Sequence, residues 1–232
     1  IKSSHRNQMD SLAITTKGRQ QALLEALKEM ISVFWGPDLK KCTEILQKPT
    51  LGPFDKLAAQ PDAWHFEALS EIKALLKEFT SAEAFFQYLE EAYVRLFISD
   101  RAGVTAPLYA SCYANTKSGE KALLMGEAAI DMKNRFESKG LSLSDEIQEP
   151  PDHLSIELEY LYFLLDKGWS DGDQDLIREA STFAAEVMLP WISEFQARLA
   201  VEKECRFYPL MVSILAAILE IIAGSNRNFE IG

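Results

Sequence analysis

Apolar residues recur every three to four positions through most of the chain, which is the spacing of one face of an α-helix. The clearest stripe runs from Gln20 to Trp35 and ends at Gly36-Pro37; its members are Leu23, Leu24, Leu27, Met30, Ile31 and Phe34. No stretch alternates apolar and polar residues between turn residues, so no sheet is predicted. The pattern therefore predicts an all-α helical bundle of about nine to ten helices.

Capping and turn residues divide this pattern into separate helices. Asp38 is placed to cap a short helix to about Leu46, and Thr80-Ser81-Ala82-Glu83 has the form of a capping box. The segment from Ser99 to Gly119 is irregular. Further helices are predicted from Pro61, Lys121 to Ser138, Asp152 to Gly168, Asp171 to Met188, Pro190 to Lys203 and Phe207 to Ala223.

The chain contains an acidic, proline-bearing connector over residues 145–151, which is the best candidate for a boundary between two helical halves. We expect an N-terminal helical half over residues 9–144, with Met9 as the native start, a hinge over 145–151, and a C-terminal helical half over 152–232. A stiff connector allows the same interface to form within one chain or between two. We therefore expect mainly monomer, with a fraction of dimer formed by exchange of halves.

Charge and cysteine content narrow the function classes. The net charge is −11 and the pI is about 4.9, which argues against nucleic-acid binding and favours a basic partner. The three cysteines are widely spaced and include no C-x-x-C pair, so we expect neither a disulfide framework nor a zinc site, and a reduced, cytoplasmic setting. The most apolar segment, residues 207–223, is marginal in length for a membrane span and is predicted to be a buried core helix rather than a membrane insertion.

Candidate chemistry gathers at Glu149-Pro150-Pro151-Asp152-His153. The two prolines stop one element, and Asp152 stands at the N-cap position of the next helix, a placement worth about 1 kcal/mol. The positive end of the helix disfavours a charged His153, whereas the neighbouring carboxylate favours it. Two interpretations of His153 stay open: a hydrogen-bonding group at an exposed corner, or a structural histidine.

The enzyme alternative is a helical metal-dependent enzyme that uses His153 and Glu157, which share a helix face at i,i+4. The chain has three histidines and no second metal motif, and it lacks a P-loop, a dinucleotide fingerprint and a nucleophile elbow. We therefore expect no enzyme activity, no metal and no cofactor. A third alternative is a structural helical adaptor with an unrelated partner.

Four segments of the chain carry a further signal when they are taken together. They are Ala106-Pro107-Leu108-Tyr109-Ala110-Ser111-Cys112-Tyr113, Leu123-Leu124-Met125-Gly126-Glu127, Glu149-Pro150-Pro151-Asp152-His153 followed by Leu158 and Leu161, and Leu189-Pro190-Trp191 followed by Phe195 and Phe207-Tyr208. In order and spacing these segments resemble one protein family, the TorD/DmsD/NarJ group of redox-enzyme maturation proteins. The resemblance covers most of the chain from about residue 60, and Glu-Pro-Pro-Asp-His is its specific part.

The resemblance implies an all-α cytoplasmic chaperone that is not an enzyme. Such a protein binds the twin-arginine signal peptide and the apoenzyme of a molybdenum-cofactor oxidoreductase, and delays export until the cofactor is inserted. The peptide-binding residues carried over are Pro151, Asp152 and His153, together with Tyr109. The loop departs from the family pattern, which often has Pro-Pro or Pro-Trp where this chain has Pro107-Leu108-Tyr109.

The charge pattern agrees with this family. A twin-arginine signal is basic at one end and apolar in the middle, so its partner needs acidic residues and an apolar groove. An acidic helical bundle can supply both, and we expect Asp152 to lie beside such a groove and to receive an arginine.

Overall fold

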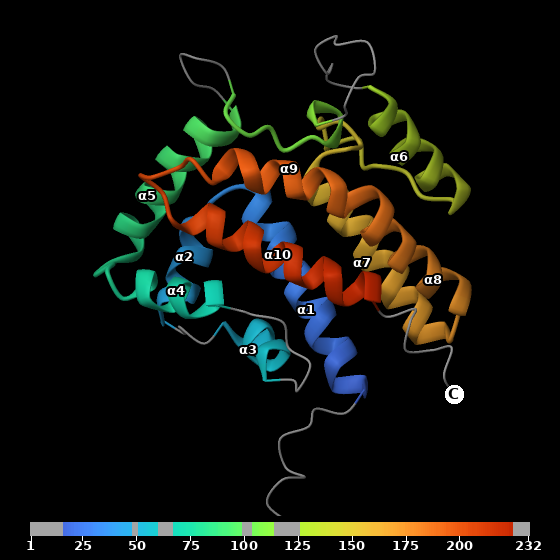
Figure 1. The fold of residues 1–232 in the computed structure, drawn as a ribbon, viewed down its shortest axis with the longest axis horizontal. Coiled ribbons are helices and arrows are strands. Elements are labelled where there is room, and N and C mark those ends of the chain that lie inside the picture. The colour runs from blue at the N-terminus through green and yellow to red at the C-terminus, as the bar shows by residue number, and fades with distance from the viewer. Residues whose placement is uncertain (1–15, 48–50, 60–66, 99–103, 114–125, 225–232) are drawn as a thin grey trace, which may run out of the picture.

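The computed structural model describes residues 16–47, 51–59, 67–98, 104–113 and 126–224. These residues form helices and contain no strand, which confirms the all-α prediction (Figure 1). The elements are α1 (Thr16–Trp35), α2 (Leu39–Gln47), α3 (Gly52–Ala58), α4 (Glu67–Leu76), α5 (Ala82–Tyr93), the π-helix η1 (Val94–Ile98), the 3-10 helix η2 (Ala110–Cys112), α6 (Glu127–Ser138), α7 (Leu154–Asp171), α8 (Gln174–Thr182), the π-helix η3 (Phe183–Met188), α9 (Leu189–Leu199) and α10 (Phe207–Gly224).

The core is built around α7 and α10. Helix α1 lies along α7, which also packs on α8, while α10 packs against α9, α4 and η3. Aromatic rings fill the space between these helices: the Phe97 ring packs against those of Phe34, Phe195 and Tyr208 at centroid distances of 6.5, 5.9 and 5.0 Å. Burial of such large apolar surfaces is the main favourable contribution to folding.

Helix α10 is the one described helix that is long and apolar enough to cross a membrane, and half of its 18-residue window is buried inside the protein. Buried positions occur all round it, because it meets helices on several sides; they include Phe207, Tyr208, Met211, Ile214, Leu215 and Ile218. This agrees with the core helix predicted from the sequence.

Several predicted helix starts are confirmed, one with a shift of a single residue. Asp38 caps α2, its Oδ1 accepting from the backbone N–H of Lys41 at 2.9 Å. Ser81, rather than Thr80, caps α5 and accepts from the N–H of Ala84 at 3.2 Å. The expected starts at Pro61 and Lys121, and the segment Leu123-Leu124-Met125, lie outside the described residues.

The predicted end of α7 at Gly168 is wrong. The helix continues to Asp171 and ends at Gly172, whose φ of 71° is in the left-handed region that favours glycine. Gly168 instead allows α8 to pack closely on α7, because a Cβ at this position would lie 2.8 Å from Ile177 Cγ1.

Two further elements differ from the prediction. Helix α3 was not predicted, because it is only seven residues long and begins at Gly52-Pro53. The predicted break before Pro190 is absent, since α8, η3 and α9 follow one another without a gap and Pro190 lies in the first turn of α9.

Helices from both sides of residues 145–151 pack together: α1 lies on α7, and α4 lies on α10. The division of the chain into two halves at this connector, and their exchange between copies, stays a prediction.

Candidate functional site

The connector and the loop at residues 104–113 are joined by backbone hydrogen bonds. The N–H of Ala110 donates to the Asp152 carbonyl at 3.0 Å, and the N–H of Leu154 donates to the Leu108 carbonyl at 2.8 Å. Between these bonds, Tyr109 and His153 form an isolated antiparallel bridge. We call this assembly, residues 108–111 with 149–154, the corner. It brings together all four predicted site residues, Tyr109, Pro151, Asp152 and His153, although Tyr109 and Glu149 are 40 positions apart in the sequence.

Asp152 is fully buried, with 0% of its surface exposed, and it is not the N-cap of α7. Its Oδ2 accepts from the backbone N–H of Ser111 at 2.8 Å. The N-cap is His153, whose Nδ1 accepts from the N–H of Ser155 at 3.2 Å. The predicted cap was therefore wrong by one residue, because the carboxylate turns toward the loop and satisfies a buried amide there. An arginine from a partner does not reach Asp152 in this arrangement.

His153 is only 3% exposed, so of its two interpretations the exposed corner does not hold. Its imidazole stacks on the Trp35 ring at 4.9 Å and 14°, and it meets the Tyr109 ring edge-on at 5.3 Å. Burial lowers the pKa of His153 to about 4, although Glu149 and Asp152 act in the opposite direction. The ring is therefore neutral at physiological pH.

Tyr109 and Pro151 are half-buried and are the predicted residues that reach the surface. The hydroxyl of Tyr109 donates to Glu149 Oε2 at 2.6 Å, and burial together with this carboxylate raises the pKa of Tyr109. Trp35 donates from Nε1 to Glu159 Oε1 at 3.2 Å. The corner is thus closed by side chains from α1, the loop and α7.

Glu157 lies below the corner and is fully buried. Its Oε2 accepts from Trp191 Nε1 at 2.9 Å, and burial raises the pKa of Glu157 well above its usual range, which favours the protonated acid. The Nδ1 of His153 and the Oε2 of Glu157 are both used in hydrogen bonds within the protein. Across the described ranges, no group of three or more His, Cys, Asp or Glu side chains is arranged to hold a metal ion.

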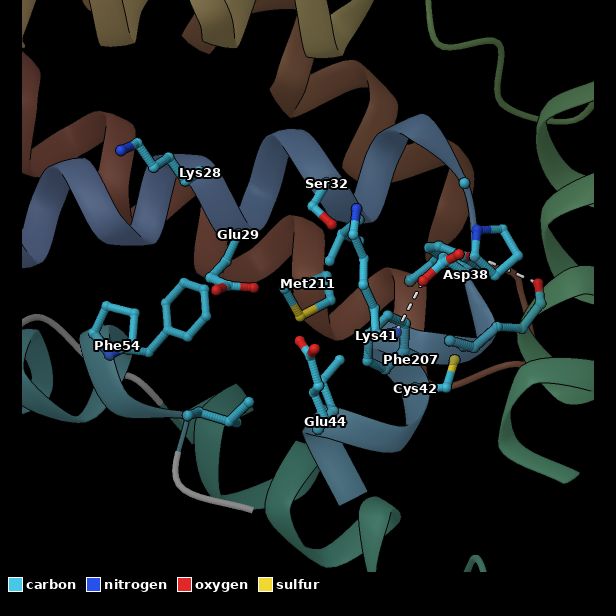
Figure 2. A pocket seen from close by; sticks show the side chains of 18 of the residues that line it. Lys28, Glu29, Ser32, Asp38, Lys41, Cys42, Glu44, Phe54, Phe207 and Met211 are labelled. Atoms are coloured by element: carbon cyan, nitrogen blue, oxygen red, sulfur yellow. Dashed lines mark hydrogen bonds between the residues drawn. The ribbon is translucent and has the colours of Figure 1, made fainter. Parts of the chain in front are cut away.

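A separate groove lies between α1, α2, α3 and α10, with a cavity of about 340 Å³ (Figure 2). Its apolar lining includes Val33, Ile45, Phe54, Phe207 and Met211, and the acidic residues Glu29, Asp38 and Glu44 also line it. Gly36 and Pro37 form part of the wall directly after Trp35, so the end of α1 contributes to both the groove and the corner. Sequence reasoning expected an apolar groove beside Asp152, and this groove is at another place.

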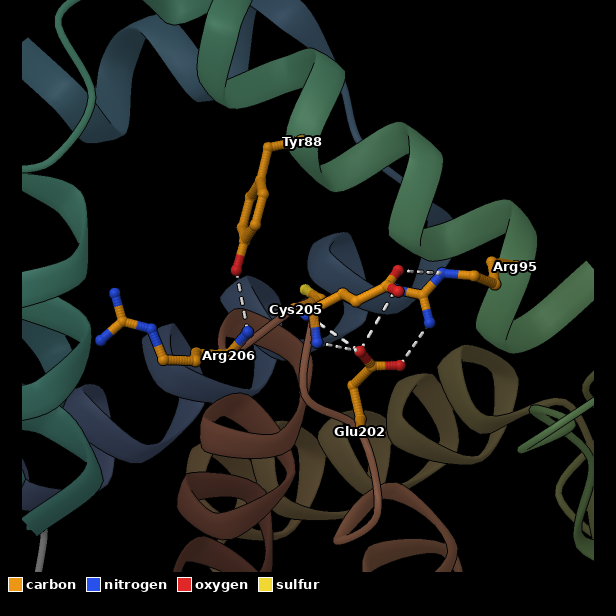
Figure 3. Close-up of polar contacts among 6 residues, drawn as sticks. Tyr88, Arg95, Glu202, Cys205 and Arg206 are labelled. Carbon is orange, nitrogen blue, oxygen red and sulfur yellow. Dashed lines mark hydrogen bonds and ion pairs between the residues drawn. The ribbon is translucent and has the colours of Figure 1, made fainter.

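The connector between α9 and α10 is held to α5 and η1 by polar contacts (Figure 3). Arg95, in η1, donates from Nη1 and Nη2 to the two oxygens of the Glu202 carboxylate, whose Oε1 also accepts from the N–H groups of Glu204 and Cys205. The Tyr88 hydroxyl accepts from the backbone N–H of Arg206 at 2.8 Å. These contacts set the start of α10, whose first turn lines the groove.

The chain was compared with known protein families. Residues 65–197, more than half of the chain, match the family model described as nitrate reductase delta subunit. The matched residues include the whole corner, whereas Trp35, which stacks on His153, lies outside them. Most of the groove, residues 28–54 and 207–211, lies outside them.

Comparison with curated proteins finds chaperones. The chaperone protein TorD of Photobacterium profundum is 29% identical over 132 residues, which cover 55% of this chain and 59% of the relative. TorD of Vibrio vulnificus strain CMCP6 is 33% identical over 114 residues, which cover 47% of this chain and 51% of the relative. The chain thus spans about half the length of the curated relatives it matches. These names agree with the prediction of a chaperone rather than an enzyme.

Comparison with solved structures finds a crystal structure described as a redox enzyme maturation protein from Archaeoglobus fulgidus. It is 22% identical, with a TM-score of 0.43, and the superposition covers 94% of this chain and 99% of that one.

Proposed function

The chain belongs to the nitrate reductase delta subunit family, and on this basis we propose that it is a cytoplasmic chaperone for the maturation of a redox enzyme. Its client is a molybdenum-cofactor oxidoreductase. The chaperone binds the twin-arginine signal peptide and the apoenzyme, assists cofactor insertion and delays export. The observation that carries the proposal is the family match over residues 65–197, which includes the connector, the loop and their hydrogen-bonded corner.

Charge supports a basic ligand. The chain has 35 acidic and 24 basic residues, so a peptide with two arginines is attracted at long range and acidic competitors are repelled. The apolar part of a signal peptide needs an apolar surface, and α1, α2, α3 and α10 supply one in the groove.

The four predicted residues have two different roles in this proposal. Tyr109 and Pro151 are half-buried and offer surface to the peptide. Asp152 and His153 are buried and affect binding only through the loop. Asp152 accepts a hydrogen bond from the Ser111 amide, and the His153 ring packs against the Tyr109 ring. They are positioning residues for the loop.

The other two functions are less well supported. In the metal-dependent enzyme, His153 and Glu157 would have to give up their hydrogen bonds to Ser155 and Trp191 before binding an ion. A structural adaptor with an unrelated partner would not distinguish a twin-arginine peptide from a scrambled one.

The test is calorimetry with a synthetic twin-arginine signal peptide of the client. We expect a dissociation constant of around 1 μM, about −8 kcal/mol. A peptide with both arginines replaced by alanine, and one with its apolar residues scrambled, should bind at least about tenfold more weakly.

Variants of the chain test which residues contact the peptide. Tyr109→Ala should weaken binding by about tenfold, because it removes an aromatic ring from the surface. The control is Ser81→Ala, which changes the N-cap residue of α5. No heat and no rise in melting temperature with the cognate peptide would overturn the proposed function.

A further inference from the structure

The groove between α1, α2, α3 and α10 combines an apolar floor with acidic side chains. Phe54, Phe207 and Met211 are buried and make the floor, while Val33 and Ile45 are half-buried walls. At about 340 Å³ the cavity is large enough for a small part of a ligand, since binding pockets usually measure about 300–1,000 Å³. It therefore suits one or two side chains of a docked segment.

Two carboxylates enter the groove from different helices. Glu29 on α1 and Glu44 on α2 both point toward the Met211 side chain (Figure 2). The partial burial of Glu29 raises its pKa, and the negative charges of Glu44 and Glu25 add to this effect, whereas Lys41 lowers it. Negative charge is thus concentrated here beside an apolar surface, and a cation placed between the two carboxylates would relieve it.

Within the described ranges, neither Lys28 nor Lys41 forms an ion pair with Glu29 or Glu44, although the charge of Lys41 acts on Glu29. Lys28 lines the groove, and its ammonium lies 4.9 Å from the centre of the Tyr162 ring. Lys41 lies on the wall, but its ammonium makes no ion pair with any other described residue. A guanidinium, which is planar and can donate to two carboxylates at once, is suited to this place.

We propose that this groove is a docking site for the twin-arginine signal peptide, distinct from the corner. One arginine lies between Glu29 and Glu44, and apolar residues of the same peptide lie on Phe54, Phe207 and Met211. Charge complementarity and the apolar floor identify the occupant as a segment that is both basic and apolar. This inference rests on the proposed function, and it adds a site formed almost wholly by residues outside the family match.

The end of α1 links this site to the corner. Gly36 and Pro37 line the groove, and the preceding residue, Trp35, stacks on His153. The two sites are therefore joined through three consecutive residues at the end of α1.

The test uses the full chain and the same synthetic peptide in calorimetry. Glu29→Gln with Glu44→Gln should weaken binding by about tenfold or more, because two charge-assisted hydrogen bonds lose their charge. Lys41→Gln should strengthen binding by roughly threefold, since it removes a competing cation. Lys40→Gln is the matched control and should leave the affinity within about twofold, since Lys40 is an exposed residue of α2 that does not line the groove.

A double-mutant cycle separates a direct contact from a general charge effect. The double Gln variant and the wild type are each titrated with the native peptide and with peptides in which one arginine is replaced by glutamine. For one of the two arginines, the losses should be strongly non-additive, because the carboxylates and that arginine form one contact. Thermal unfolding checks that the variants keep their fold.

The outcomes distinguish the two proposals. If the native peptide binds wild type and the double Gln variant equally, or if the losses are additive for both arginines, the groove is not the site and the proposed function stands. If no twin-arginine peptide binds wild type at all, the proposed function falls and the groove assignment falls with it.

Discussion

The buried imidazole of His153 makes a quantitative prediction about stability and pH. The perturbation is His153→Asn. Asparagine is among the best N-cap residues, so its side-chain oxygen can accept from Ser155 as the imidazole does. The variant loses the ring contacts with Trp35 and Tyr109, which lowers stability by a similar amount at every pH. It also loses the titrating group.

The magnitude follows from the difference in pKa between the unfolded and folded states. The pKa of a histidine is 6.5 in the unfolded chain, and burial lowers that of His153 to about 4 in the folded protein. The unfolded state therefore binds a proton more readily, so stability is complete above pH 6.5 and falls as the pH falls toward 4. The loss should reach about 2 kcal/mol at pH 5 and about 3 kcal/mol at pH 4.

The assay is urea unfolding followed by circular dichroism, at pH values from 8 to 5. The wild type should lose about 2 kcal/mol more than the His153→Asn variant over this range, a midpoint difference of roughly 1 M urea for a slope of about 2 kcal/mol per M. Carboxyl groups such as Glu157 also titrate, but they are present in both proteins and largely cancel in the comparison. Parallel pH profiles for the two proteins would refute the reasoning, since they would mean that the ring titrates as an exposed histidine does.

Three further substitutions test other contacts by the free energy of unfolding. Asp152→Ala should cost about 1–3 kcal/mol, because it leaves the Ser111 amide buried without a partner, whereas Asp152→Asn keeps an accepting oxygen and should cost less; equal losses would contradict this account. Gly168→Ala places a methyl group 2.8 Å from Ile177 Cγ1 and should cost about 1–3 kcal/mol in a thermal melt; an unchanged midpoint would mean that α7 and α8 separate freely. Ser81→Ala should cost about 1 kcal/mol and Ser81→Asp much less, and a loss in both would exclude capping as the cause.

The helices could be predicted because their signals are local. The stripe from Gln20 to Trp35 and the cap at Asp38 each depend on residues within a few positions, and the structure has α1 and α2 there. Helix α3 has no such stripe, since seven residues are too few to show a helical repeat of apolar positions. Its first residues, Gly52-Pro53, are typical of a turn. The predicted end of α7 was wrong because Gly168 makes room for Ile177 of α8 and does not end the helix. A contact between two helices cannot be inferred from the spacing of residues along one of them.

The residues of the corner could be predicted from the sequence, but their geometry could not. The motif Glu-Pro-Pro-Asp-His drew attention to Asp152, but the group that donates a hydrogen bond to Asp152 is the Ser111 amide, 41 residues earlier in the chain. Trp35 was assigned only to the end of a helix stripe, although its ring forms one side of the histidine site from more than 100 residues away. The clue that could have drawn attention to it is a tryptophan placed directly before Gly36-Pro37, where a helix ends and side chains meet other elements.

The amino end of α7 has a consequence for anionic ligands. An open helix start offers free amides and a positive dipole, and it attracts phosphate groups. Here the first four amides are already used: Leu154 donates to the Leu108 carbonyl, Ser155 donates to the imidazole of His153, and the next two donate to the His153 carbonyl. The corner is therefore closed to a phosphate, whether of a nucleotide or of a pterin cofactor, for as long as the loop stays paired to it.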